Sequence, residues 1–206
     1  MTFPDRKFSD IGGFADAYFA EWRKAAASVD RDKLAEAAEI LAGLHERGGT
    51  LWVCGNGGSA AIANHLVADH GKLLAQDTGL LPHVHSLTTN IPVITAIAND
   101  IDYAEVFSHQ LSLNARAGDA LITVSSSGDS ENVVRAVQWA KDNGLEVISM
   151  TGFSGGRSAG LADVNLHVDA DNYGVIEDTH QALMHLLGQY LRQGRMSEEL
   201  VQDRKF

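Results

Sequence analysis

Cysteines and long apolar runs are scarce in this sequence, and each shortage excludes a class of protein. Its 206 residues include one cysteine, Cys54, so an intrachain disulfide framework is excluded and a reducing cytoplasm is the expected setting. No apolar run approaches the roughly 18–20 residues that a membrane helix needs. The first ten residues are polar and lack the apolar centre of a signal peptide. We therefore expect a cytoplasmic protein without a membrane partner.

Basic residues are also in short supply. The chain has 16 lysines and arginines against 27 aspartates and glutamates, which gives a net charge of −11. A nucleic-acid-binding protein carries the opposite excess, so nucleic acid is not expected as the main partner. If the protein binds an anion, it must do so mostly with backbone N–H groups and hydroxyls.

What the chain does contain is an alternation of short apolar strands with helices, which begins at Thr50 and is typical of a parallel sheet. The pattern predicts one α/β domain with helices on both faces of the sheet. The expected strands are Leu51–Cys54, Val84–Leu87, Ala120–Val124, Glu146–Met150 and Asn165–Val168. The expected helices of this domain are Ser59–Leu74, Ile91–Ala98, Asp102–Ala115, Ser130–Asn143 and Val175–Gln193.

Two amphipathic helices precede this domain. The first spans about Ser9–Ser28, and Asp30 is placed to cap a second one that ends at Gly48-Gly49. Helices of this kind often form a bundle with a partner chain. We therefore divide the chain into residues 1–48, a helical hairpin for oligomerisation, and residues 49–206, the α/β domain.

The first strand runs into a glycine turn, Gly55-Asn56-Gly57-Gly58-Ser59, and then into a helix. Glycines permit close backbone approach, and a helix N-terminus offers free N–H groups to an anion. The turn also fits the dinucleotide fingerprint G-x-G-x-x-A, but that fingerprint requires an acidic residue at the end of the second strand. The second strand has none, so no nucleotide cofactor is expected.

A second strand-to-helix loop, Ser125-Ser126-Ser127-Gly128-Asp129-Ser130, carries four hydroxyls. Capping the next helix needs only one such side chain, so the pattern favours an anion site over a plain turn. Both loops follow parallel strands, at the sheet edge where open α/β folds bind their ligands.

Ionisable residues gather on the helices that leave or approach this edge. His65 and Asp69 are four residues apart on one helix face, a spacing that suits a divalent ion, a general base or an ordinary surface pair. Glu177 and His185 are eight residues apart, about 12 Å of helical rise, so one ion cannot take both from the same straight helix. Either the helix begins after Glu177, or His185 serves a site on a neighbouring chain.

Together these loops, the Asn99-Asp100 pair and the histidine-bearing last helix resemble the sugar isomerase (SIS) family, in its phosphoheptose isomerase branch. The resemblance spans the whole chain. It implies a single SIS domain with a five-stranded, flavodoxin-like parallel sheet. It also implies a homotetramer with active sites between subunits, and isomerisation of sedoheptulose 7-phosphate to D-glycero-D-manno-heptose 7-phosphate through an enediol. The product would serve lipopolysaccharide or capsule heptose synthesis.

The resemblance also assigns roles to residues. A divalent metal ion, zinc in the family, would be held by His65, Asp69, Glu177 and His185, with Asp69 at the position of the family's base and His185 at that of its acid. The residues expected to bind the sugar phosphate are Asn56, Gly57, Gly58, Ser59, Asn99, Asp100, Ser125, Ser126, Ser127 and Ser130.

Three positions depart from the family pattern. Asp69 replaces a glutamate, Glu177 replaces a glutamine, and Gly174 replaces an aspartate that bears on sugar specificity. One hypothesis is that the carboxylate has moved, so that Glu177 abstracts the proton while Asp69 holds the metal. The alternatives are an isomerase for another sugar phosphate, a sensor without turnover, and a regulatory SIS protein that resembles the branch binding a replication initiator. The retained ionisable residues favour an enzyme.

Overall fold

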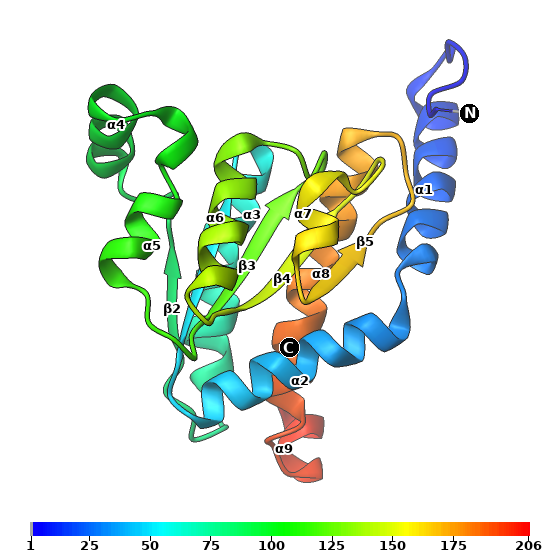
Figure 1. The fold of residues 1–206 in the computed structure, drawn as a ribbon. Helices are drawn as coiled ribbons and strands as arrows, with labels where there is room; N and C mark the ends of the chain where they lie inside the picture. Colours follow the sequence, from blue (N-terminus) through cyan, green and yellow to red (C-terminus); the bar gives the residue numbers. More distant parts are fainter. Residues whose placement is uncertain (1) are drawn as a thin grey trace.

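A computed structural model describes residues 2–206 and shows a five-stranded, all-parallel sheet in the order β2-β1-β3-β4-β5 (Figure 1). This order is that of flavodoxin-like folds, so the predicted α/β architecture is confirmed. Each strand lies within one or two residues of its predicted position. The strands are β1 (Thr50–Gly55), β2 (His83–Ser86), β3 (Ala120–Ser125), β4 (Glu146–Thr151) and β5 (Val164–His167).

The predicted helices are also present, and two short ones are added that the sequence pattern did not indicate, α7 and α9. No helix within residues 2–206 combines the length and the apolar content needed to cross a bilayer. The helices are α1 (Ile11–Ser28), α2 (Arg31–Glu46), α3 (Gly58–Val67), α4 (Ile91–Asp100), α5 (Ser108–Asn114), α6 (Glu131–Asp142), α7 (Gly156–Leu161), α8 (Tyr173–Gln193) and α9 (Glu198–Asp203). A π-helical segment, η1 (Ala68–Leu73), continues α3, and a 3₁₀ turn, η2 (Tyr103–Glu105), precedes α5.

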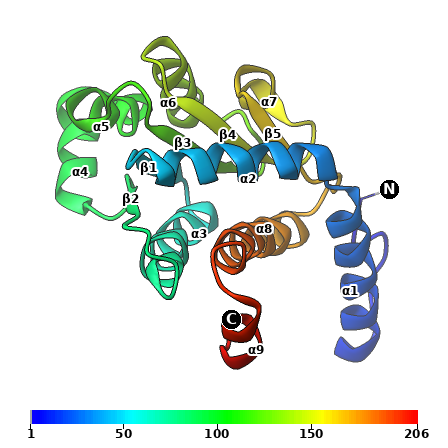
Figure 2. The same cartoon turned by 90° about the horizontal axis from the view of Figure 1, so that it is seen from below.

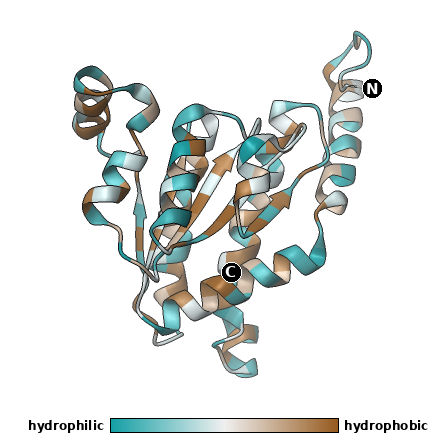
Figure 3. Ribbon diagram, viewed as in Figure 1, coloured by the Kyte–Doolittle hydropathy of each residue, from teal (hydrophilic) through white to brown (hydrophobic). Residues whose placement is uncertain are grey.

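Helices cover both faces of the sheet and make a three-layer structure (Figure 2). The core between the sheet and α2, α3 and α8 includes Leu41, Leu66 and Met184, all fully buried. The core on the other face includes Leu111 of α5 and Val137 of α6. Because both faces are covered, β3 is buried along its whole length, and its ribbon is largely apolar in Figure 3.

The two N-terminal helices diverge instead of lying against each other as the hairpin expected from the sequence. Asp30 caps α2 as predicted, accepting hydrogen bonds from the N–H groups of Asp32 and Lys33. Helix α1 packs along α8, where the Tyr18 hydroxyl donates to Asp178 at 2.7 Å. Helix α2 instead runs beneath the sheet and contributes to the domain core (Figure 2). An oligomerisation role for residues 1–48 stays a prediction.

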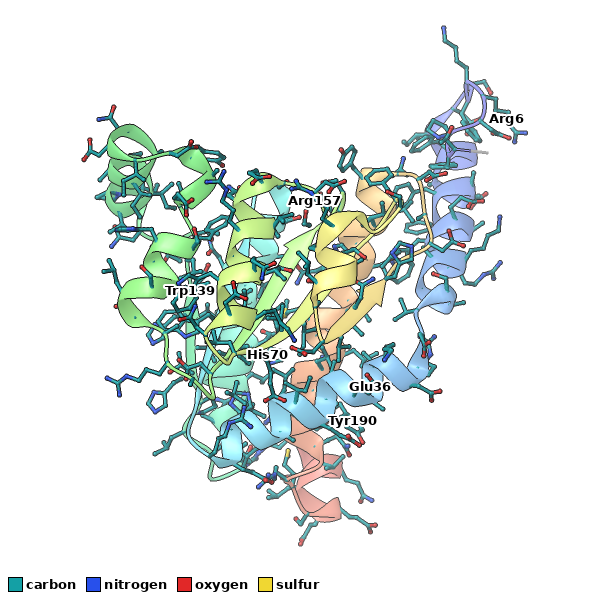
Figure 4. All side chains as sticks on the ribbon, in the orientation of Figure 1. Arg6, Glu36, His70, Trp139, Arg157 and Tyr190 are labelled. Atoms are coloured by element: carbon teal, nitrogen blue, oxygen red, sulfur yellow. The ribbon has the colours of Figure 1, made fainter. Side chains whose placement is uncertain are left out.

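The buried histidine His45 gives stability a dependence on pH. Burial, and secondarily the nearby His70 (labelled in Figure 4), lower the pKa of His45 from 6.5 to about 4. Neither of its ring nitrogens has a hydrogen-bond partner within residues 2–206. Between these two pKa values the unfolded chain binds more protons than the folded one. Stability therefore falls as the pH drops below about 7, by up to about 1.4 kcal/mol per pH unit for this residue.

We expect His45→Leu to raise the free energy of unfolding at pH 5.5 by roughly 1 kcal/mol more than at pH 7.5, because leucine removes the titrating group without breaking a hydrogen bond. Urea denaturation at the two pH values measures this difference. The exposed His109 provides the control as His109→Leu. An equal gain from His45→Leu at both pH values would contradict the prediction.

Candidate active site

The sheet order creates a crevice between the two loops that the sequence singled out. Strands β1 and β3 are neighbours, but α3 leaves β1 toward one face while α6 leaves β3 toward the other (Figure 1). Such a switch point opens a gap at the carboxyl ends of the strands, where open α/β folds bind ligands. Both loops lie at this edge, as predicted.

The glycine turn after β1 brings bare backbone to this crevice. Gly57 has a φ of 55°, a conformation that favours glycine, and its position before α3 leaves the first N–H groups of the helix without a side-chain cap. Asn56 anchors the turn from across the crevice: its amide exchanges hydrogen bonds of 2.8 and 3.0 Å with Asn132 of α6 and accepts one of 3.0 Å from Tyr103. Ser59, in the first turn of α3, is buried.

The serine loop after β3 uses only part of its hydroxyls to hold itself together. Ser125 and Ser127 accept hydrogen bonds from backbone N–H groups of their own turn, at 3.2 and 3.3 Å. Ser130 occupies the N-cap of α6 without making a side-chain cap. The buried Ser126 hydroxyl has no hydrogen-bond partner among residues 2–206. A buried hydroxyl in this state is suited to receive a ligand oxygen.

Arg157 of α7 braces the serine loop from outside. Its guanidinium donates to the Asp129 carboxylate at 2.9 Å and to the Asp129 carbonyl at 2.9 Å, and hydrogen bonds from Arg157 hold the pKa of that carboxyl below its usual value. Gly128 has a φ of 65° and packs so tightly that a Cβ there would meet the Gly155 carbonyl oxygen. This positive charge, labelled in Figure 4, is thus engaged in shaping the loop. The turn of residues 150–156, expected to be structural, contacts it.

Three of the four predicted metal ligands meet where α3 and its π-helical continuation pack on α8. The Asp69 carboxylate lies 2.5 Å from His185 Nδ1 and 3.6 Å from His65 Nε2, and one ligand atom from each residue lies within 4.8 Å of the others. Asp69 belongs to η1, the kind of π-helical turn that recurs at functional sites. Two imidazoles and a carboxylate are a donor set that suits a catalytic zinc ion, so these residues fit the expected metal.

Glu177 lies apart from these three residues. Helix α8 is continuous from Tyr173 to Gln193, which removes the alternative that it begins after Glu177. The Glu177 carboxylate instead lies against the glycine turn: a Cβ on Gly58 would be 2.6 Å from Glu177 Oε2. About 12 Å of helical rise separates it from His185. Within one chain, Glu177 is therefore placed with the predicted substrate loops, and its role as a metal ligand stays a prediction.

Asn99 and Asp100 are the last residues of α4, and both are exposed. The Asn99 amide donates to the Asp100 carboxylate at 2.8 Å. The segment that follows reaches the glycine turn through the hydrogen bond between Tyr103 and Asn56. Binding of a polyol by Asn99 and Asp100 stays a prediction.

Residues 17–152 match the model of the SIS domain family. The chain is 39% identical to the phosphoheptose isomerase of Rhodospirillum rubrum over 154 residues, which cover 75% of this chain and 81% of that protein. It is 38% identical to a probable phosphoheptose isomerase of Thermoplasma acidophilum over 84% of this chain and 94% of that protein. The chain belongs to the phosphoheptose isomerase branch of the SIS family. The structure of the Neisseria gonorrhoeae phosphoheptose isomerase superposes with a TM-score of 0.80 at 34% identity, covering 89% of this chain and all of that one.

Within this SIS domain the structure explains one departure from the family pattern. The Tyr18 hydroxyl lies 2.9 Å from where a Cβ on Gly174 would stand, so α1 occupies the space that a larger side chain would need. Burial and the Asp178 carboxylate raise the pKa of Tyr18, which keeps its hydroxyl protonated as a donor.

Sequence reasoning missed Gln181, whose amide nitrogen lies 3.0 Å from His65 and 3.0 Å from His185. A signal was available, because Gln181 is four residues from both Glu177 and His185 and so shares their helix face. Tyr103 and Asn132 were also missed, and no local pattern distinguishes them from ordinary polar residues.

Proposed function

We propose that this protein is an aldose–ketose isomerase that converts sedoheptulose 7-phosphate to D-glycero-D-manno-heptose 7-phosphate. The observation that carries the proposal is the pairing, on one SIS fold, of an anion-suited crevice with a His65–Asp69–His185 group. The phosphoheptose isomerase relatives at 38–39% identity support the choice of substrate. The more distant SIS folds that bind or sense other sugar phosphates share the architecture but have a lower identity, at or below 19%.

The phosphate is held in the crevice by hydroxyls and backbone N–H groups. Ser126 contributes its unpaired buried hydroxyl, and Ser125, Ser127 and Ser130 surround it on the same loop. The glycine turn at Asn56–Ser59 adds the N-terminus of α3. An acidic chain with net charge −11 thereby binds a dianion without lysine or arginine contacts, and the binding energy orients the sugar at a distance from its reacting carbons.

Glu177 transfers the proton between C1 and C2 of the open-chain sugar. Its carboxylate lies beside the glycine turn, whereas the Asp69 carboxylate is engaged by both His65 and His185. An engaged carboxylate is a weaker base, so the arrangement supports the transfer of the base function to Glu177. His185 protonates the sugar oxygen as the enediol forms and recovers that proton as the enediol collapses to the aldose.

A divalent ion, zinc by the chemistry of its donors, is held by His65, Asp69 and His185. When bound, it stabilises negative charge on the sugar oxygen. Glu177, the fourth expected ligand, joins this group from a second copy of the chain, because the helical rise keeps it from His185 in its own.

The active site therefore lies between subunits, and we propose a cytoplasmic homotetramer. Each site combines the loops and Glu177 of one chain with the His65–Asp69–His185 group of another. The exposed Ile11 and Phe19 of α1 and Tyr190 of α8 are apolar surface available for such contacts. The product would supply heptose for lipopolysaccharide or capsule synthesis.

The test is a panel of ketose phosphates with seven, six and five carbons, each incubated with the protein in deuterated water and followed by proton NMR. We expect deuterium to enter the sugar only with sedoheptulose 7-phosphate, together with the appearance of the aldose. Exchange with another member alone would identify a different isomerase. Binding without exchange would indicate a sensor or regulatory protein.

A further inference from the structure

One amide bridges the two imidazoles of the candidate metal group. Gln181 extends from α8 between His65 of α3 and His185, and its Nε2 lies 3.0 Å from a ring nitrogen of each. The two rings stand edge to face, with their centroids 4.9 Å apart. A single side chain therefore contacts both histidines while belonging to the same helix as one of them.

The contacts divide the four ring nitrogens into two pairs. Asp69 faces Nε2 of His65 and Nδ1 of His185. Gln181 faces the remaining two, Nδ1 of His65 and Nε2 of His185. A metal ion that takes Asp69 together with both histidines binds the first pair, which leaves the second pair to Gln181.

The two pairs require opposite protonation in the free and the metal-bound protein. Without metal, N–H groups facing Asp69 donate to its carboxylate, and the bare nitrogens opposite need a donor. With metal, the ligating nitrogens are bare and the N–H groups point to the other side, where they need an acceptor. An amide meets both demands at one place, because its NH₂ and its carbonyl oxygen exchange positions when the group turns over.

We propose that Gln181 is a positioning residue that holds His65 and His185 in the ligating orientation by serving as donor before metal binding and as acceptor after it. The inference rests on the metal site of the proposed function and adds to it a residue outside the expected ligand set. Neither a hydrocarbon nor a fixed donor at residue 181 can replace the amide in both states, whereas a carboxylate can replace it in the bound state.

The test measures zinc affinity of the full-length protein by competition with a chromophoric chelator. We expect Gln181→Leu to weaken zinc binding by roughly 10–100-fold, the usual cost of removing a partner of a ligating histidine. Gln181→Glu should restore or exceed the wild-type affinity, since its carboxylate accepts both N–H groups. The control is Gln193→Leu, which changes an exposed residue on the last turn of α8 and should leave affinity unchanged.

A second readout needs no metal. In ¹⁵N-labelled, zinc-free wild type we expect His185 to carry its proton on Nδ1, facing Asp69, and in Gln181→Glu on Nε2, facing the new carboxylate. Wild-type zinc affinity in Gln181→Leu, or an unchanged proton position in Gln181→Glu, would overturn the proposal. Absence of isomerase turnover in a wild type that shows these effects would refute the proposed function alone, so the two failures are distinguishable.

Discussion

Glu177→Gln is expected to lower kcat for the heptose phosphate by roughly 10²–10⁴-fold, the usual contribution of a general base. The amide keeps the size of the side chain and its place beside Gly58, but it cannot accept the sugar proton. The KM should change little, because the phosphate is held by the serine loop. Exchange of the C1 and C2 protons with deuterated solvent should fall in parallel with kcat, which separates proton transfer from substrate binding.

Asp69→Asn is the informative comparison. It should also lose activity, but through weaker metal binding, so added zinc should recover part of the rate in Asp69→Asn and none in Glu177→Gln. Glu198→Gln, an exposed residue of α9, serves as the matched control and should retain full activity. Unchanged turnover in Glu177→Gln would refute the transfer of the base function from residue 69 to residue 177.

Two inactive variants are expected to restore activity when they share one oligomer. A site between subunits takes the metal group from one chain and the loops with Glu177 from another. Mixing His185→Ala with Glu177→Gln therefore creates sites in which both contributions are intact. With equal amounts and random assembly, about a quarter of the sites combine the two unmodified halves. Co-expression with two affinity tags, followed by a turnover assay on the doubly tagged fraction, measures the recovery.

A matched pair shows whether recovery comes from sharing. His185→Ala and Asp69→Asn alter the same group of residues, so their mixed oligomers contain no site with an intact metal group and should stay inactive. Sites built within a single chain predict no recovery from either mixture. Recovery in the first mixture alone would establish that the 12 Å between Glu177 and His185 is spanned by two copies.

The sequence alone determined the β/α alternation and the two ligand loops. Strand β3 is apolar at almost every position because both its faces are buried, and that demand is visible in a local run of residues. The glycine turn and the serine loop are equally local, because close backbone approach and hydroxyl donors are encoded in consecutive residues. The i, i+4 spacing of His65 and Asp69 identified one half of the metal group in the same way.

Tertiary structure decided which of these residues meet. The partner of Asp69 is His185 and not Glu177 because α8 is a continuous helix packed in one register along α3, and a helix presents each side chain at a fixed height. That register also places Glu177 at Gly58 and Gln181 between the two imidazoles. Contacts of this kind join residues more than a hundred positions apart, so no local pattern encodes them and only the packing of the helices settles them.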